Sequence, residues 1–268
     1  MANSKHDNMS FLEHLEELRW HVIRSLIAII SAGFVCFLMK DFIFDTIIFG
    51  PKKMDFPTYK FLCQAATFIG VETNFCGDEF PFVVQNRTMA GQFSAHVMTS
   101  VISGFIISFP YVLYEFWKFI SPGLLEKEKA KSRGFIFISS ILFFVGVLFG
   151  YYVISPLSIN FLGTYQVSTQ VLNEIDLGSF ISLVRSSALA SGIIFELPII
   201  IYFLTKAGVV TPESLVKYRK YALVLVLILA AIITPPDVAS QIIVAIPIVV
   251  LYQVSIFISR IVVKNQNK

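Results

Sequence analysis

Long apolar segments alternate with shorter polar ones along the whole chain. Six apolar segments can be delimited, at about residues 22–39, 93–119, 135–154, 179–203, 221–233 and 242–258. Each must be helical where it crosses a bilayer, because lipid gives backbone N–H and C=O groups no other hydrogen-bond partner. The pattern therefore predicts an all-α integral membrane protein in which residues 1–268 form a single polytopic domain with six transmembrane helices.

The composition agrees with this class. Hydrophobic residues make up 56% of the chain and charged residues only 15%. A soluble domain carries roughly 25% charged residues. The mean hydropathy of the chain is +0.74, which excludes an ordinary soluble globular protein.

The positive charges indicate which side of the membrane each connection faces. Most of the 21 Lys and Arg residues lie near the two termini and in the connections that follow the second and fourth apolar segments. The connections 155–178 and 234–241 contain neither Lys nor Arg. By the positive-inside rule, both termini are expected in the cytoplasm. The net charge of +3 thus reflects topology, and no nucleic-acid binding is expected.

The N-terminal residues predict a short cytoplasmic interfacial helix within residues 1–21. Ser10 and Glu13 have the spacing of a capping box, and from Phe11 onward apolar residues recur at helical spacing opposite acidic ones. No basic region precedes the first apolar segment and no small-x-small cleavage site follows it. A cleavable signal peptide is therefore not expected.

Two cysteines lie in the long connection at residues 42–92, which the topology places outside the cytoplasm. In an oxidising compartment, a bridge between Cys63 and Cys76 would close a loop and stabilise the fold by roughly 3 kcal/mol. Two free thiols are the alternative.

The last two apolar segments predict short helices. Residues 221–233 make about 20 Å of helix, whereas the hydrocarbon core is about 30 Å thick. Residues 242–258 contain Pro247. The two segments are joined by Thr234-Pro235-Pro236-Asp237, a rigid turn with a capping carboxylate. A short hairpin that thins the bilayer locally is expected.

Glu196 is an ionisable residue inside one of the longest apolar stretches. A charged group near the bilayer centre costs about 2.5–3.5 kcal/mol, so it usually faces a protein or water-lined cavity and serves a function. The alternative is a protonated carboxyl that bonds a neighbouring helix. Arg185 is the other ionisable residue deep in the predicted spans; it shares a helix face with Glu196, and we interpret it as an interfacial anchor.

No enzyme site emerges from the sequence. The four His residues have no metal-ligand spacing, and no Gly-rich phosphate loop or Ser-His-acid set is present. Neither an enzymatic activity nor a metal or cofactor is expected.

Four motifs, in order and in the expected topology, carry a family resemblance. They are His14-Leu15-Glu16-Glu17-Leu18-Arg19, Phe119-Ile120-Ser121-Pro122-Gly123-Leu124 with Glu128, Phe195-Glu196-Leu197-Pro198, and Thr234-Pro235-Pro236-Asp237-Val238-Ala239-Ser240-Gln241. Together they resemble the TatC subunit family of the twin-arginine protein translocase. The chain departs from that family in its long, Cys-containing connection at residues 42–92.

The resemblance implies a concave, cup-like arrangement of helices in the cytoplasmic (inner) membrane. It implies a receptor for folded exported proteins whose signal peptides carry paired arginines. The implied partners are single-span TatA-like and TatB-like proteins, further copies of the chain in the complex, and membrane lipid, with the proton-motive force as energy source.

The resemblance also implies roles for particular residues. Signal-peptide binding is implied for Glu17, Arg19, Phe119 and Glu128. An intramembrane polar contact to a partner is implied for Glu196 and Gln241. Structural turns are implied at Pro122, Pro235, Pro236 and Asp237.

The chemistry of two carboxylates agrees with these roles. Two guanidinium groups need carboxylate acceptors, because arginine forms bidentate charge-assisted bonds that lysine does not reproduce. Glu17 and Glu128 are both expected at the cytoplasmic surface. Their alternative role is local charge balance with nearby Lys and Arg residues. For the whole chain, two alternatives are a secondary transporter that uses Glu196 as an ion or proton site and a membrane-assembly factor.

Overall fold

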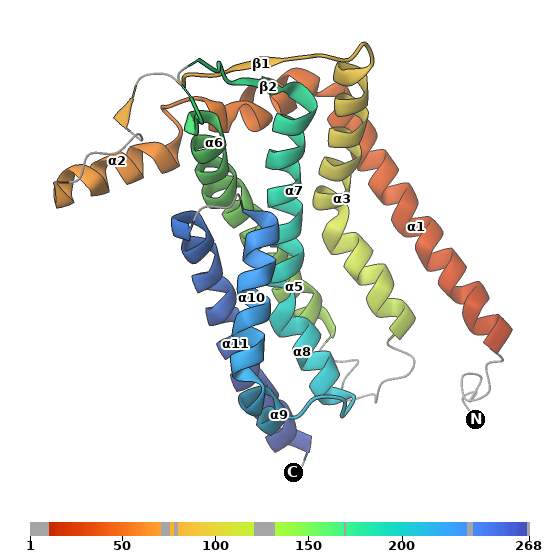
Figure 1. The fold of residues 1–268 in the computed structure, drawn as a ribbon. Coiled ribbons are helices and arrows are strands. Elements are labelled where there is room, and N and C mark those ends of the chain that lie inside the picture. Colours follow the sequence, from red (N-terminus) through yellow and green to blue (C-terminus); the bar gives the residue numbers. More distant parts are fainter. Residues whose placement is uncertain are drawn as a thin grey trace, which may run out of the picture. The chain divides into compact units, whose positions relative to one another are not determined.

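The computed structural model describes residues 11–70, 76–77, 80–120, 132–168, 170–234 and 238–266. Nearly all of them are helical (Figure 1). The chain divides into two compact units, one of Met1–Lys40 with His96–Ile141 and one of Asp41–Ala95 with Leu142–Lys268. Each unit is described by itself.

The first unit is built on α1 (Phe11–Leu38) and on α3 (Gly91–Ile120) from His96 onward. The two helices approach closely at glycines, since a Cβ atom at Gly104 would lie 2.6 Å from the Cα atom of Gly33. Near one end of α1, His96 Nε2 lies 3.0 Å from the carbonyl oxygen of Phe37, and the two rings stack at 4.0 Å. The first part of α5 (Ser132–Phe149) completes this unit.

Residues 11–21 are helical, as expected, but they are not a separate interfacial helix. α1 continues from Phe11 to Leu38 without a break. The physical reason is that no Gly or Pro interrupts the helix between Phe11 and Ala32. The capping residue Ser10 lies outside the described residues.

The second unit contains the segments 42–92 and 155–178, which were predicted to be connections. Residues 42–92 include the π-helix η1 (Phe42–Ile48), the 3-10 helix η2 (Gly50–Lys52), α2 (Pro57–Ile69) and strand β1 (Val83–Gln85). After α5 the chain continues as the π-helix η5 (Gly150–Ile154), α6 (Ser155–Thr164) and strand β2 (Glu174–Asp176). β1 and β2 pair in parallel, with Val83 opposite Glu174. The described residues of these connections thus include helices and strands.

The fourth apolar segment is two helices rather than one. α7 (Leu177–Phe195) ends at Glu196, and α8 (Leu197–Lys206) begins after it. Pro198 explains the break, because it has no backbone N–H and its ring clashes with the carbonyl four residues earlier. α7 packs closely against α5, where a Cβ atom at Gly146 would lie 2.7 Å from both Ser191 O and Phe195 Cβ. The lack of a side chain at Gly146 therefore allows α5 and α7 to pack closely.

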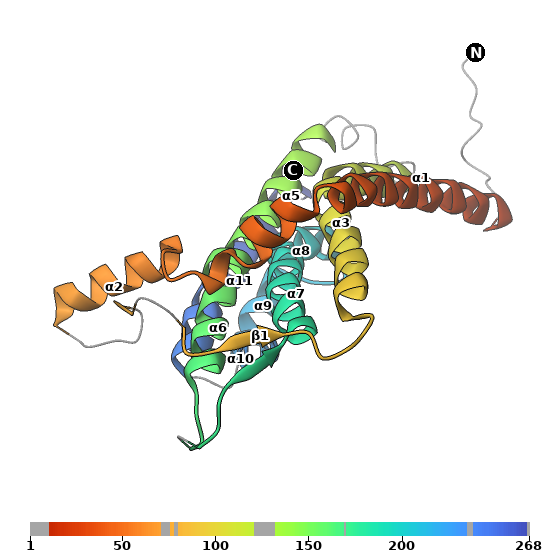
Figure 2. The same ribbon diagram turned by 90° about the horizontal axis from the view of Figure 1, so that it is seen from above.

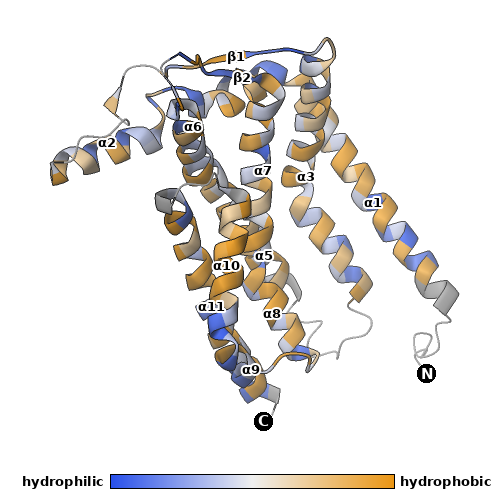
Figure 3. Ribbon diagram, in the orientation of Figure 1, coloured by the Kyte–Doolittle hydropathy of each residue, from blue (hydrophilic) through white to orange (hydrophobic). Residues whose placement is uncertain are grey.

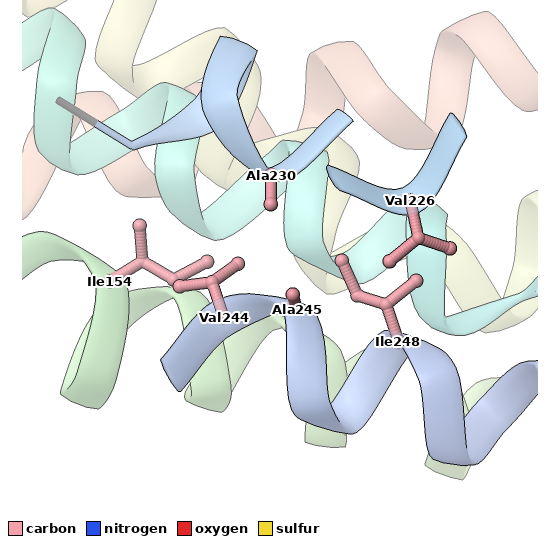
Figure 4. Close-up of a cluster of buried hydrophobic side chains, with 6 residues drawn as sticks. All are labelled: Ile154, Val226, Ala230, Val244, Ala245 and Ile248. Carbon is pink, nitrogen blue, oxygen red and sulfur yellow. The ribbon is translucent and has the colours of Figure 1, made fainter. Parts of the chain in front are cut away.

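The C-terminal part contains α9 (Pro212–Lys217), α10 (Arg219–Ile233) and α11 (Val238–Gln266). Val226 and Ala230 of α10 face Val244, Ala245 and Ile248 of α11, and Ile154 of η5 joins this buried cluster (Figure 4). α8 packs along α11, where Thr205 Oγ1 donates to Ser259 Oγ at 2.9 Å.

Five helical stretches of the described residues are long and apolar enough to cross a membrane (Figure 3). They are Leu15–Leu38, Gly91–Ile120, Gly134–Thr164, Leu177–Lys206 and Ser240–Asn265. α10 is short, as predicted, since it has only 15 residues. That α10 crosses the membrane stays a prediction. The prediction that the last helix is also short is wrong. α11 has 29 residues, because it tolerates Pro247 and continues past its apolar segment through Arg260 and Lys264.

Candidate functional site

A buried charged cluster joins α1 to α3 in the first unit. His21 of α1 is 8% exposed and Glu115 of α3 is 2% exposed. His21 Nδ1 lies 2.6 Å from Glu115 Oε2, and Arg24 Nη1 lies 3.5 Å from the same oxygen. Tyr111 also hydrogen-bonds Glu115. A buried carboxylate without such partners would be strongly destabilising, so this cluster locks the two helices together.

This cluster was not predicted from the sequence. Glu196 and Arg185 were predicted as the deep ionisable residues, although Glu115 lies inside the predicted segment 93–119 and is more deeply buried than Glu196. An acidic residue in an apolar segment was the available signal. Its partner could not be read from the sequence, because His21 and Glu115 are 94 residues apart.

Glu17 lies one helical turn before His21 and is half-buried. Its Oε2 atom is buried and has no hydrogen-bond partner among the described residues. Arg19 and Arg24 are the nearby arginines that could balance its charge. Arg19 bonds Glu16 at 3.3 Å instead, and both of those side chains are exposed. Arg24, the other candidate, bonds Glu115. Glu17 therefore presents a carboxylate that these two arginines leave available.

Phe119 lies one turn after Glu115 on α3. Its ring meets that of His21 edge-on, with centroids 6.2 Å apart. Residues four apart lie on the same side of a helix. His21 thus contacts both Glu115 and Phe119, and it lies one turn after Glu17 on α1. Glu17, Arg19 and Phe119, three of the four residues implied in signal-peptide binding, therefore lie on the parts of α1 and α3 that this cluster joins. Glu128 and Pro122 lie outside the described residues.

Glu196 marks the second region, in the other unit. Its side chain is 9% exposed, and it occupies the junction of α7 and α8, where its carbonyl oxygen accepts hydrogen bonds from Ile199 and Ile200. The carboxyl is therefore enclosed by protein. Ser187 and Ser191, on the preceding turns of α7, are also buried. Arg185 is only half-buried, and its role as an anchor stays a prediction.

The remaining predicted residues of the second unit have structural contacts. Gln241 Nε2 donates to the carbonyl oxygen of Leu227 at 3.1 Å and so ties α11 to α10. Cys63 and Cys76 form a disulfide, with Cα atoms 5.2 Å apart. Pro235, Pro236 and Asp237 lie outside the described residues. Among the described residues, no group of three His, Cys, Asp or Glu side chains is arranged to hold a metal ion.

The fold and these two buried polar regions define a polytopic helical membrane protein whose ionisable groups are enclosed between its helices. Residues 13–247 match the family described as "Sec-independent protein translocase protein (TatC)". The chain belongs to this family, and it is therefore a component of the Sec-independent protein translocase. Membership implies a complex with other Tat subunits, and the family is one of transport components rather than a known enzyme family.

Known relatives cover the whole chain. It is 46% identical to the Sec-independent protein translocase protein TatC of Blattabacterium sp. subsp. Periplaneta americana over 99% of this chain and 100% of that protein. It is 34% identical to TatC of Aquifex aeolicus over 97% of this chain and 98% of that one. A crystal structure of the twin arginine translocase receptor TatC is 31% identical, with a TM-score of 0.68 over 94% of this chain and 100% of that chain. A second such structure, in DDM, is 33% identical, with a TM-score of 0.70 over 92% and 99%.

Proposed function

We propose that this protein is the receptor subunit of a twin-arginine translocase and that it binds the paired arginines of signal peptides at the α1–α3 site. The observation that carries the proposal is the Glu17 carboxylate. One of its oxygens is buried without a hydrogen-bond partner among the described residues, while Arg19 and Arg24 are bonded to other carboxylates. An enclosed acceptor of this kind is complementary to an incoming guanidinium group.

The chemistry of the site favours arginine over lysine. A carboxylate accepts two parallel N–H bonds from a planar guanidinium, whereas an ammonium group offers only a compact point charge. Glu17 is the acceptor for one arginine of the pair, and Glu128 is the acceptor for the other. Phe119 supplies an apolar surface beside them for the stem of an arginine side chain. His21 and Glu115 hold Glu17 and Phe119 at a fixed spacing and act as positioning residues.

The rest of the function follows from the same assignment. The chain crosses the inner membrane six times, and both of its termini lie in the cytoplasm. It works with TatA-like and TatB-like single-span proteins and with further copies of itself, and the proton-motive force drives the export of folded cargo. Glu196 is the polar contact for a partner's single span, since a protein-enclosed carboxyl at a helix junction can donate or accept a hydrogen bond there.

One observation favours a second candidate. A helix interrupted beside a buried carboxyl is also found in secondary transporters, whose substrate sites lie at broken helices. In that case Glu196 would be an ion or proton site. Membership of a protein-translocase family favours the first proposal, in which the cargo is a protein.

A peptide-binding experiment tests the receptor proposal. A labelled twin-arginine signal peptide is titrated onto the detergent-solubilised protein and onto Glu17→Gln, with Glu16→Gln as the matched control on the same helical turn. Loss of a charged partner costs about 1.5–3 kcal/mol, so the affinity of Glu17→Gln is expected to fall about 10-fold to 150-fold. The control should bind as the parent does, and a Lys-Lys peptide should bind weakly to all three. Equal affinities of Glu17→Gln and the parent would refute the assignment.

A further inference from the structure

α2 carries an apolar face that the rest of its unit leaves uncovered. Phe61 is 69% exposed, Phe68 93% and Ile69 73%. At 100° per residue these three side chains fall within one third of the helix circumference, with Leu62 and Ala65 among them. Lys60 and Gln64 lie outside this face and are exposed as well. α2 is therefore amphipathic, and its apolar face is the exposed one.

The remaining side of α2 is firmly attached to the unit. Tyr59 is fully buried, and its hydroxyl donates to the carbonyl oxygens of Pro51 at 2.8 Å and Pro156 at 3.0 Å. Burial raises the pKa of Tyr59, which keeps the hydroxyl protonated as a donor. The Cys63–Cys76 disulfide holds the next turn. Because these contacts fix the rotation of the helix, the direction of its apolar face is fixed too.

The residues that hold α2 lie in the C-terminal part of a candidate membrane span. This span, Gly134–Thr164, has 31 residues, whereas about 20 apolar residues cross the hydrocarbon core, so part of the helix extends beyond the core. The residues next to α2 lie in this part: Pro156 accepts from Tyr59, and the ring of Tyr152 stacks on Phe56 at 5.4 Å. Tyrosine is common at membrane–water interfaces.

The direction of α2 matches a helix that lies along a membrane surface. Figures 1 and 2 show it extending sideways from the helices of its unit and crossing the direction of α6 and α7. Leu148 and Tyr152, which are half exposed, belong to a candidate membrane span beside it.

The charges next to α2 fit the same partner. Lys60 on α2 and Lys53 in the preceding segment are exposed. Interfacial helices typically carry lysines on their polar side, from which the long side chains reach the phosphates of lipid headgroups.

We infer that α2 is an interfacial helix whose apolar face, formed by Phe61, Phe68 and Ile69, inserts into the lipid bilayer beside the spans. The bilayer thereby covers the surface that the protein leaves exposed and supports the segment between η2 and β1. The inference is independent of signal-peptide binding.

Tryptophan quenching tests it. Phe68→Trp and Phe61→Trp report from the apolar face, and Gln64→Trp, on the same helix but outside that face, is the matched control. Each full-length variant is placed in vesicles of phosphatidylethanolamine and phosphatidylglycerol, with or without bromine on the acyl chains near the headgroup. The emission of the parent, which has two Trp residues, is subtracted. An interfacial helix buries its apolar face about 5–10 Å deep, so the two Phe variants should lose about half or more of the added emission and the control much less.

Two outcomes would overturn the inference. One is quenching at Gln64→Trp equal to that at Phe68→Trp and Phe61→Trp. The other is blue-shifted emission at Phe68→Trp that brominated lipid does not quench. If dilution of the protein in lipid reverses this blue shift, a second copy of the chain covers the face instead of lipid. Phe68 is almost fully exposed, so its replacement leaves the packed core unchanged.

Discussion

The His21–Glu115 pair gives the most direct test of the α1–α3 site. His21→Ala removes the closest partner of a carboxyl that is 2% exposed. Full loss of a buried ion-pair partner costs about 3–5 kcal/mol. Arg24 still lies 3.5 Å from Glu115 Oε2 and is half exposed, so we expect the smaller cost of about 1.5–3 kcal/mol that is typical of one hydrogen bond to a charged group.

The assay is thermal unfolding of the purified protein in detergent, followed by binding of a twin-arginine peptide. At about 2–4 °C per kcal/mol, His21→Ala should lower the unfolding midpoint by about 3–12 °C. Glu16→Ala, which removes an exposed ion pair with Arg19, is the control and should change it little. The peptide affinity of His21→Ala should fall as well, because Glu17 and Phe119 lose their fixed spacing.

A double-mutant cycle separates the pair from its surroundings. If His21 and Glu115 stabilise the protein through their mutual contact, the double variant should lose less free energy of unfolding than the sum of the losses in His21→Ala and Glu115→Ala. Strict additivity would refute the coupling. A melting midpoint of His21→Ala equal to that of the parent would refute the reasoning as a whole, since a buried carboxylate would then need no partner at this position.

Three further predictions concern the second unit. Glu196→Gln keeps the shape and the hydrogen bonding of the side chain, so it should retain most export of folded cargo. Glu196→Leu should lose export without unfolding the protein. If Glu196→Gln is as defective as Glu196→Leu in an export assay, ionisation of Glu196 is the property that export needs. Four Leu residues inserted into α10 add about 6 Å of helix, which should impair export while leaving peptide binding intact; normal export by a stably inserted variant would contradict membrane thinning. Cys63→Ser should lower the free energy of unfolding by about 3 kcal/mol. Cys36→Ser, which removes no disulfide, is the control. Equal unfolding midpoints of Cys63→Ser and of the control would contradict this prediction.

Periodicity and hydropathy predicted most of the helices, because an apolar face or segment is a local property of the sequence. α3 and α11 contain the segments expected to span, α1 covers all but the last residue of the first segment, and α5 together with η5 covers the third. α10 is about as short as its apolar run. The helix break at Glu196 was also readable in principle, since Pro198 stands two residues later. It was overlooked because the apolar run continues through it.

What could not be predicted depends on contacts between distant residues. Nothing local marks Val83 and Glu174 as neighbours in a parallel pair, and strands of three residues are too short for an alternating pattern. His21 and Glu115 illustrate the same limit at the site. Their importance comes from mutual burial, and burial is a property of the assembled helices. In the same way, the sequence could not show that Arg19 and Arg24 leave the Glu17 carboxylate unpaired by them, because their bonds to Glu16 and Glu115 are visible only in the structure.

The parallel pair of β1 and β2 also sets an order of events during synthesis. Arg87, just after β1, bonds Glu174 of β2 at 3.1 Å, and the two residues are 87 positions apart. At the ribosomal rate of about 5–20 residues per second, β2 is synthesised roughly 4–17 s after β1. During that interval the backbone edge of β1 is unpaired and open to other chains. The nascent protein is thus open to misassembly from the time before its second apolar segment has emerged until just before its fourth emerges.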